Sequence, residues 1–147
     1  MSTDGLTLEE RVQRLEDLQA ISRLFHDYRR YLDGKDFSSY SQLFVEDGVF
    51  GAAEAPKGPV EIQKYVEGLI PRGNLREHKG EDLHLVANEV VDLDGDSATA
   101  YVTWVYIVRD EDGAPVLCKT GHYDDTLVRH EGRWKFARRR GSGQMSQ

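Results

Sequence analysis

The sequence predicts an α+β fold in which helices come first and a curved antiparallel sheet follows. Before Pro71 the apolar residues recur at helical spacing, and beyond it they alternate with a period of two, as in strands. Helices followed by consecutive strands are typical of α+β proteins, whereas a parallel sheet alternates strands with helices. We therefore expect two helices, a strand, a third helix and four strands, with one sheet wrapped around the helices.

The first helix is predicted to begin after Thr7, because Thr7 and Glu10 have the spacing of a capping box. Apolar side chains then follow in steps of three and four, which places one apolar stripe along a long helix. The stripe consists of Val12, Leu15, Leu18, Ile21, Phe25, Tyr28 and Leu32. Gly34 is expected to end this helix.

Two shorter helices are predicted next, with a short strand between them. Asp36 suits the N-cap of the first, which is expected to end near residues 46–48. Its apolar residues are Phe37, Tyr40, Leu43 and Phe44. Val49 and Phe50 are expected to open the strand. Pro59 suits the first turn of the other helix, whose buried face consists of Ile62, Tyr65, Val66 and Leu69.

Four strands are predicted over residues 82–92, 97–109, 115–129 and 133–140. They are joined by Asp94-Gly95, Asp112-Gly113 and Glu131-Gly132, and such dipeptides favour tight turns between antiparallel strands. The second half of the chain is therefore predicted to form an antiparallel meander.

Length and composition predict one domain over residues 1–147, with an ordered core of about residues 7–140 and flexible ends. The 19 basic and 26 acidic residues give a net charge of -7, which disfavours nucleic acid and anionic membranes as partners. Cys118 is the only cysteine, and no apolar run is long enough to span a bilayer. We therefore expect a cytoplasmic protein.

Five short segments carry a resemblance that covers nearly the whole chain. They are LEDLQAI (15–21), YLDGKD (31–36), LFVEDG (43–48), GHYDD (121–125) and GRWKF (132–136). In this order and spacing they resemble the SnoaL-like branch of the nuclear transport factor 2-like superfamily. The resemblance implies a cone-shaped αα-β-α-ββββ roll around one small-molecule pocket. Relatives include scytalone dehydratase, a hexachlorocyclohexane dehydrochlorinase and ketosteroid isomerase, so the fold alone does not decide the chemistry.

The resemblance implies a catalytic pair, Asp33 and His84. In the dehydratase and dehydrochlorinase relatives, an aspartate at the end of the first helix orients a histidine on the first long strand. Histidine accepts protons near neutral pH, and a carboxylate on its other ring nitrogen fixes the tautomer. By alternation His84 shares a strand face with Val86, Asn88 and Val90. The alternative is that Asp33 only ends the helix and His84 is a structural histidine.

Five further residues are candidates for substrate binding: His122, Tyr31, Tyr101, Tyr106 and Phe50. His122 lies in the strand region where the dehydratase has a second histidine, and the tyrosines offer phenol donors. The alternatives are an exposed strand histidine and aromatic residues of the core. Two departures matter: Leu32 replaces a tyrosine of the dehydratase, and Ala52 stands where ketosteroid isomerase has its aspartate.

We expect no metal and no cofactor, because residues 92–96 lack the spacing of a calcium loop and no phosphate-binding glycine loop occurs. The expected function is a cofactor-independent lyase that eliminates hydroxide or halide from a small hydrophobic substrate, polycyclic or alicyclic. An isomerase and a domain that only binds a ligand are the alternatives. A homodimer or higher homo-oligomer is expected, because an apolar outer sheet face, carrying Trp104 or Tyr106, needs cover.

Overall fold

A computed structural model describes residues 3–52 and 54–145 of the chain. The elements are α1 (Leu8–Asp33), α2 (Phe37–Ser41), β1 (Phe44–Phe50), α3 (Gly58–Glu67), β2 (Asp82–Asp94), β3 (Ser97–Arg109), β4 (Pro115–His130) and β5 (Arg133–Gln144). The α+β class and the order αα-β-α-ββββ are therefore confirmed. The ends expected to be flexible include residues 1–2 and 146–147, which lie outside the described residues.

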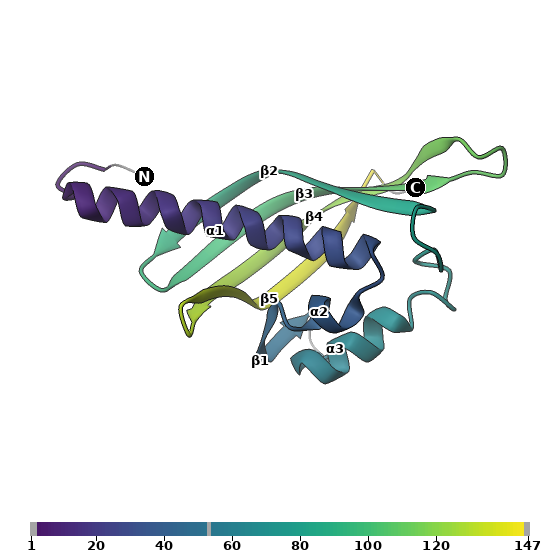
Figure 1. Ribbon diagram of the computed structural model, residues 1–147, viewed down its shortest axis with the longest axis horizontal. Coiled ribbons are helices and arrows are strands. Elements are labelled where there is room, and N and C mark those ends of the chain that lie inside the picture. Colours follow the sequence, from purple (N-terminus) through teal and green to yellow (C-terminus); the bar gives the residue numbers. More distant parts are fainter. Residues whose placement is uncertain (1–2, 53, 146–147) are drawn as a thin grey trace.

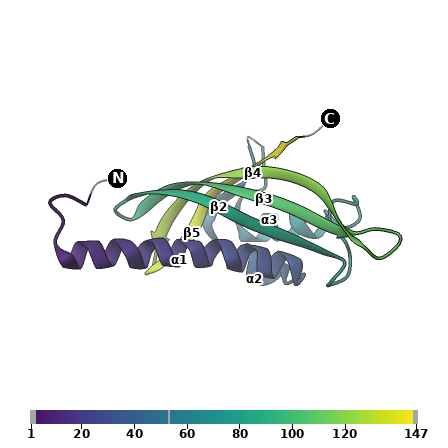
Figure 2. The same cartoon turned by 90° about the horizontal axis from the view of Figure 1, so that it is seen from above.

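Helix α1 begins with the predicted capping box. The Thr7 hydroxyl accepts a hydrogen bond from the Glu10 N–H, and the Glu10 carboxylate accepts one from the Thr7 N–H. From Ile21 onward the apolar stripe is buried, but Val12 and Leu15 are exposed. The N-terminal end of α1 extends past the β2–β3 turn (Figure 2).

Helix α2 is shorter than predicted. It ends at Ser41, and Phe44, expected in the helix, is instead the first residue of β1. Phe44 is in register with Phe136 of β5, and their ring centroids lie 5.2 Å apart. This contact between distant segments outweighs the local helical spacing.

The five strands form one sheet in the order β1-β5-β4-β3-β2. Strands β2 to β5 make the predicted antiparallel meander, whereas β1 pairs with β5 in parallel, so the sheet is mixed. The sheet arches over α1, and α2 and α3 cover the end near β1 and β5 (Figures 1 and 2). The apolar core fills the space between these two layers.

A β-bulge divides β2 into two halves. The register shifts between Ala87 and Val90, and Asn88 has a φ of 56°. His84 faces the helices, but Val90 pairs with Tyr101 and lies on the outer face. The prediction that Val90 shares the face of His84 is therefore wrong, because the extra residue reverses the alternation.

Trp104 and Tyr106 lie on the inner face of the sheet, which corrects their predicted place on the outer face. Tyr106 is opposite His84 and Trp104 is opposite Val86, and opposite residues share a face. The rings of Trp104 and Tyr123 lie 6.0 Å apart within the core. The exposed apolar residues of the outer face are instead Leu83, Leu85, Val90, Tyr101 and Leu117.

A buried ion pair joins β4 to β5. The Nε and Nη2 atoms of Arg139 each donate to the Asp125 carboxylate at 2.8 Å, and neither side chain is exposed to solvent. Four rings surround the guanidinium: Phe25, Tyr28, Tyr123 and Phe136. Burial alone would lower the pKa of Arg139, but the Asp125 carboxylate outweighs burial and raises this pKa above its ordinary value. The guanidinium is therefore charged inside the core.

Candidate active site

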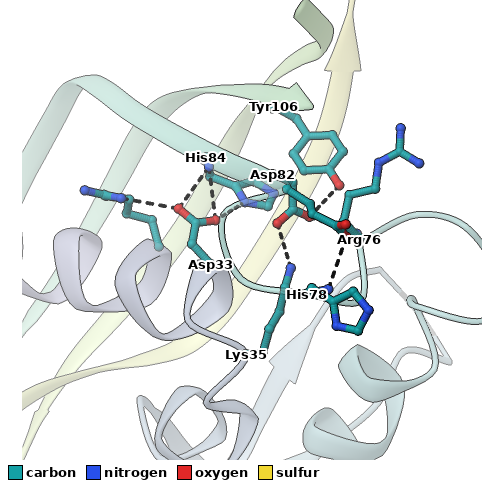
Figure 3. Close-up of polar contacts among 9 residues, drawn as sticks. Asp33, Lys35, Arg76, His78, Asp82, His84 and Tyr106 are labelled. Atoms are coloured by element: carbon teal, nitrogen blue, oxygen red, sulfur yellow. Dashed lines mark hydrogen bonds and ion pairs between the residues drawn. The ribbon is translucent and has the colours of Figure 1, made fainter. Parts of the chain in front are cut away.

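The end of α1 meets the start of β2 at the candidate site (Figure 3). Asp33 is the last residue of α1, and the chain turns away at Lys35, which has a φ of 57°. His84 lies near the start of β2 with its side chain on the inner face, where α1 packs along the strand. Two residues distant in the sequence are thus brought together where helix and strand meet.

Asp33 and His84 form a hydrogen-bonded pair. The Nδ1 atom of His84 lies 2.8 Å from Oδ1 of Asp33, and the backbone N–H of His84 lies 3.0 Å from both carboxylate oxygens. A guanidinium nitrogen of Arg29 donates to Oδ2 at 3.3 Å. Because an ionised carboxylate only accepts hydrogen bonds, Nδ1 must carry the proton. In the neutral ring the lone pair is therefore on Nε2.

The ring of His84 is held between its partner and an aromatic side chain. It stacks on Tyr106 with centroids 4.7 Å apart and an interplanar angle of 29°. Only 9% of the His84 side chain is exposed, and Nε2 has no hydrogen-bond partner among the described residues. This arrangement can present the lone pair of the basic Nε2 atom of His84 in a fixed direction.

Asp82, two residues before His84 on the same face, is the centre of a second polar cluster. Its carboxylate accepts from Lys35 Nζ at 2.7 Å, the Tyr106 hydroxyl at 2.7 Å and the Arg76 backbone N–H at 2.9 Å. Burial acts to raise the pKa of Asp82, but these hydrogen bonds outweigh burial and lower this pKa below its ordinary value. Burial and the bond to Asp82 raise the pKa of the Tyr106 phenol, which therefore stays protonated as the donor.

A pocket of about 340 Å³ reaches this region from outside. Asp33 and Asp82 line it, together with Arg29 and Arg109, but His84 does not. The pocket therefore approaches the pair from its carboxylate side.

His122 and Tyr101 lie away from the pair. The two rings stack on the outer face of the sheet, 4.7 Å apart, and His122 Nε2 lies 3.2 Å from Oδ2 of Asp124. His84 is on the inner face, so the structure does not bring His122 or Tyr101 to the candidate site.

The other three candidates, Tyr106, Tyr31 and Phe50, lie in three different places. Tyr106 lies against His84, with its hydroxyl already bound to Asp82. Tyr31 lies in a groove beside α2 and the start of β5, beneath the guanidinium of Arg30. Phe50 ends β1 inside an aromatic cluster with Tyr40, Phe44 and Tyr65. Of these candidates, only Tyr106 contacts the Asp33–His84 pair.

The sequence analysis missed Arg29, Asp82 and Lys35. Arg29 could have been found, because it precedes Asp33 by four residues on a predicted helix. Asp82 could have been found, because it precedes His84 by two residues on a predicted strand and so shares its face. Lys35 carries no such signal, since its partner is 47 residues away. Within the described ranges, no cluster of three or more His, Cys, Asp or Glu residues suits a metal, and no helix is long and apolar enough to span a membrane.

Comparison with known proteins agrees with this architecture. The chain belongs to the SnoaL-like domain family, whose model matches residues 13–140. It is similar to an NTF2-like protein with a cystatin-like fold from Novosphingobium aromaticivorans, at 26% identity and a TM-score of 0.83, over 99% of this chain and 94% of that chain. No curated protein matches the chain.

Two further solved structures are similar over most of their length. One, also from Novosphingobium aromaticivorans, is provisionally named a scytalone dehydratase; it is 28% identical, with a TM-score of 0.73, over 90% of this chain and 87% of that chain. The other is ActVI-ORFA from Streptomyces coelicolor, 21% identical, with a TM-score of 0.75, over 88% of this chain and 98% of that chain. The second similarity concerns the fold alone.

Proposed function

We propose that this domain is a cofactor-independent lyase in which His84 is the general base and Asp33 orients it. The observation that carries the proposal is the 2.8 Å contact between Nδ1 and Asp33, which leaves Nε2 without a hydrogen-bond partner among the described residues. A carboxylate on one ring nitrogen holds the tautomer in which the other nitrogen is basic.

The proposed reaction is an elimination. Nε2 of His84 takes a proton from carbon, and the electrons of that C–H bond form the new double bond as the leaving group departs from the neighbouring carbon. Asp33 stabilises the imidazolium through the Nδ1–H bond. If the leaving group is a hydroxyl, the imidazolium returns the proton to it, which releases water and regenerates neutral His84. A halide leaves as the anion, and solvent then removes the proton.

A small hydrophobic substrate, alicyclic or polycyclic, is proposed on the basis of the residues beside His84. Val86, Trp104 and Tyr106 lie beside His84 on the inner face and belong to or pack against the apolar core. Leu83, Ile107 and Val108 give the pocket on the Asp33 side an apolar lining. The provisional name of the Novosphingobium relative favours dehydration among the eliminations. An isomerisation would use the same first proton transfer.

The proposal is tested with Asp33→Asn on a panel of hydroxylated and halogenated alicyclic and polycyclic compounds. The wild type should release elimination products. Asp33→Asn should lower the rate on the order of 100-fold, because the NH₂ group of the new amide donates to Nδ1 and so disfavours the tautomer with its lone pair on Nε2. Product formation is followed by mass spectrometry. Asp27→Asn is the control; Asp27 is on the same helix and, among the described residues, its ion pairs are with Arg23 and Arg30.

If a compound of the panel binds the wild type and Asp33→Asn equally while neither protein forms product, the domain is a ligand-binding module and not an enzyme. Equal turnover by the two proteins would instead remove Asp33 from the mechanism.

A homodimer joined through the outer sheet face is also proposed. Leu85 is 50% exposed and Leu117 is 62% exposed on this face, and such apolar surface is stabilised when a second copy covers it. Leu85→Asp should shift the sedimentation coefficient from dimer to monomer. Leu8→Asp, on the exposed start of α1, is the control. A monomeric wild type would contradict the proposal.

A cytoplasmic location is proposed as well, since a single cysteine suits a reducing compartment.

A further inference from the structure

Asp82 connects three separate segments beside the candidate site (Figure 3). Lys35 follows α1, Arg76 belongs to the segment between α3 and β2, and Tyr106 is on β3; each donates one hydrogen bond to the Asp82 carboxylate. The Asp82 side chain has no solvent exposure and that of Lys35 has 10%. A buried carboxylate with three donors and a compensating charge holds its partners in a defined geometry.

Tyr106 links this cluster to His84. One end of Tyr106, the hydroxyl, is fixed by Asp82 at 2.7 Å, and its ring face stacks on the imidazole at 4.7 Å. The Nδ1 edge of the same ring is fixed by Asp33. The Asp33 bond sets which nitrogen is protonated, but a single hydrogen bond leaves the ring free to tilt around it. The stacked Tyr106 removes that freedom.

We infer that Asp82 is a positioning residue for the proposed reaction, acting on His84 through Tyr106, with Lys35 neutralising its charge. This inference rests on the proposed function of His84 as the base. The Asp82 carboxylate bonds Lys35, Arg76 and Tyr106, and among the described residues it makes no hydrogen bond to His84, so Tyr106 is the hydrogen-bonded link between them. Fixing the plane of the imidazole aims the Nε2 lone pair, and proton transfer depends on that direction.

The inference is tested with Asp82→Asn, Tyr106→Phe and the double variant. On the compound that the wild type converts fastest, Asp82→Asn should lower kcat about tenfold with little change in KM, because the ground-state contacts of the substrate remain. Tyr106→Phe keeps the stacked ring but removes the hydroxyl, so it should have a similar effect. The double variant should be no slower than either single variant, since both changes break the same connection.

A second measurement needs no substrate. In NMR spectra of the wild type, the Nδ1–H proton of His84, held by Asp33, should exchange slowly with water. In Asp82→Asn and Tyr106→Phe this exchange should be at least about tenfold faster, because the ring is no longer held in plane. Asp17→Asn is the matched control, since Asp17 is also a buried carboxylate with several donors but lies at the other end of the core, with Arg129 and Trp134.

The outcomes separate this inference from the proposed function. If Asp33→Asn loses activity while Asp82→Asn and Tyr106→Phe keep wild-type kcat and wild-type Nδ1–H exchange, the positioning role is overturned and the base remains. Additive effects in the double variant would also overturn it, because Asp82 would then act by another route. If Asp82→Asn fails to fold, Tyr106→Phe and Lys35→Met carry the same test.

Discussion

Replacing His84 with alanine should lower the rate of elimination on the order of 10⁴-fold, the upper end of what general acid–base catalysis contributes. The Asp33→Asn variant keeps an imidazole that is basic part of the time, whereas His84→Ala leaves no group to accept the proton. The fold should persist, because the backbone N–H of residue 84 still donates to Asp33 and the strand register is unchanged. Single-turnover kinetics on the best substrate of the panel measures the effect.

His26→Ala is the control for this experiment. His26 lies on the same α1 helix that carries Asp33 but has an exposed side chain and no part in the pair. It should retain the wild-type rate. A His84→Ala protein that still turned over the substrate at the His26→Ala rate would show that another group removes the proton.

Asp125→Asn should lower the free energy of unfolding by about 3–5 kcal/mol, because it leaves the Arg139 cation buried without its counterion. The four surrounding rings offset part of the loss but cannot replace the two hydrogen bonds. Urea unfolding followed by circular dichroism measures the change, with the slope of the transition checked for two-state behaviour.

Asp124→Asn is the matched control for Asp125→Asn. The two aspartates are neighbours on β4, but the Asp124 side chain is 60% exposed on the outer face. Its replacement should change the free energy of unfolding by less than about 0.5 kcal/mol. The double variant Asp125→Leu/Arg139→Met should recover most of the stability, since it removes both charges together. Equal stability of Asp124→Asn and Asp125→Asn would contradict a role of the buried pair.

Elements with local signals were predictable from the sequence. The capping box of α1 and the three turn dipeptides between β2 and β5 depend on neighbouring residues, and the structure has the helix and the hairpins there. Phe44 shows the limit: its helical spacing predicted α2, whereas its partner is Phe136, 92 positions later in the chain. A strand that depends on one distant partner carries little local evidence.

The candidate site was predictable only in part. Asp33 and His84 were named because the resemblance supplied their places. In the structure Asp33 ends α1, His84 lies on the inner face of β2, and their side chains are hydrogen-bonded. His122 was named because the resemblance supplied a histidine in its strand region, and Tyr101 because it offers a phenol donor. Alternation shows which residues share a face within one strand but not which face turns inward, so their place on the outer face could not be predicted. Lys35 was missed because its contact with Asp82 depends on how the chain turns after α1.

The extra residue at Asn88 divides β2 into two segments, and the alternation of inward-facing and outward-facing side chains is reversed between them. The segment that carries Asp82 and His84 points them at the helices, while the segment from Val90 onward presents its own side chains with the opposite phase. The irregularity thus lets one strand serve the core with both halves: even-numbered residues face inward before it and odd-numbered residues face inward after it.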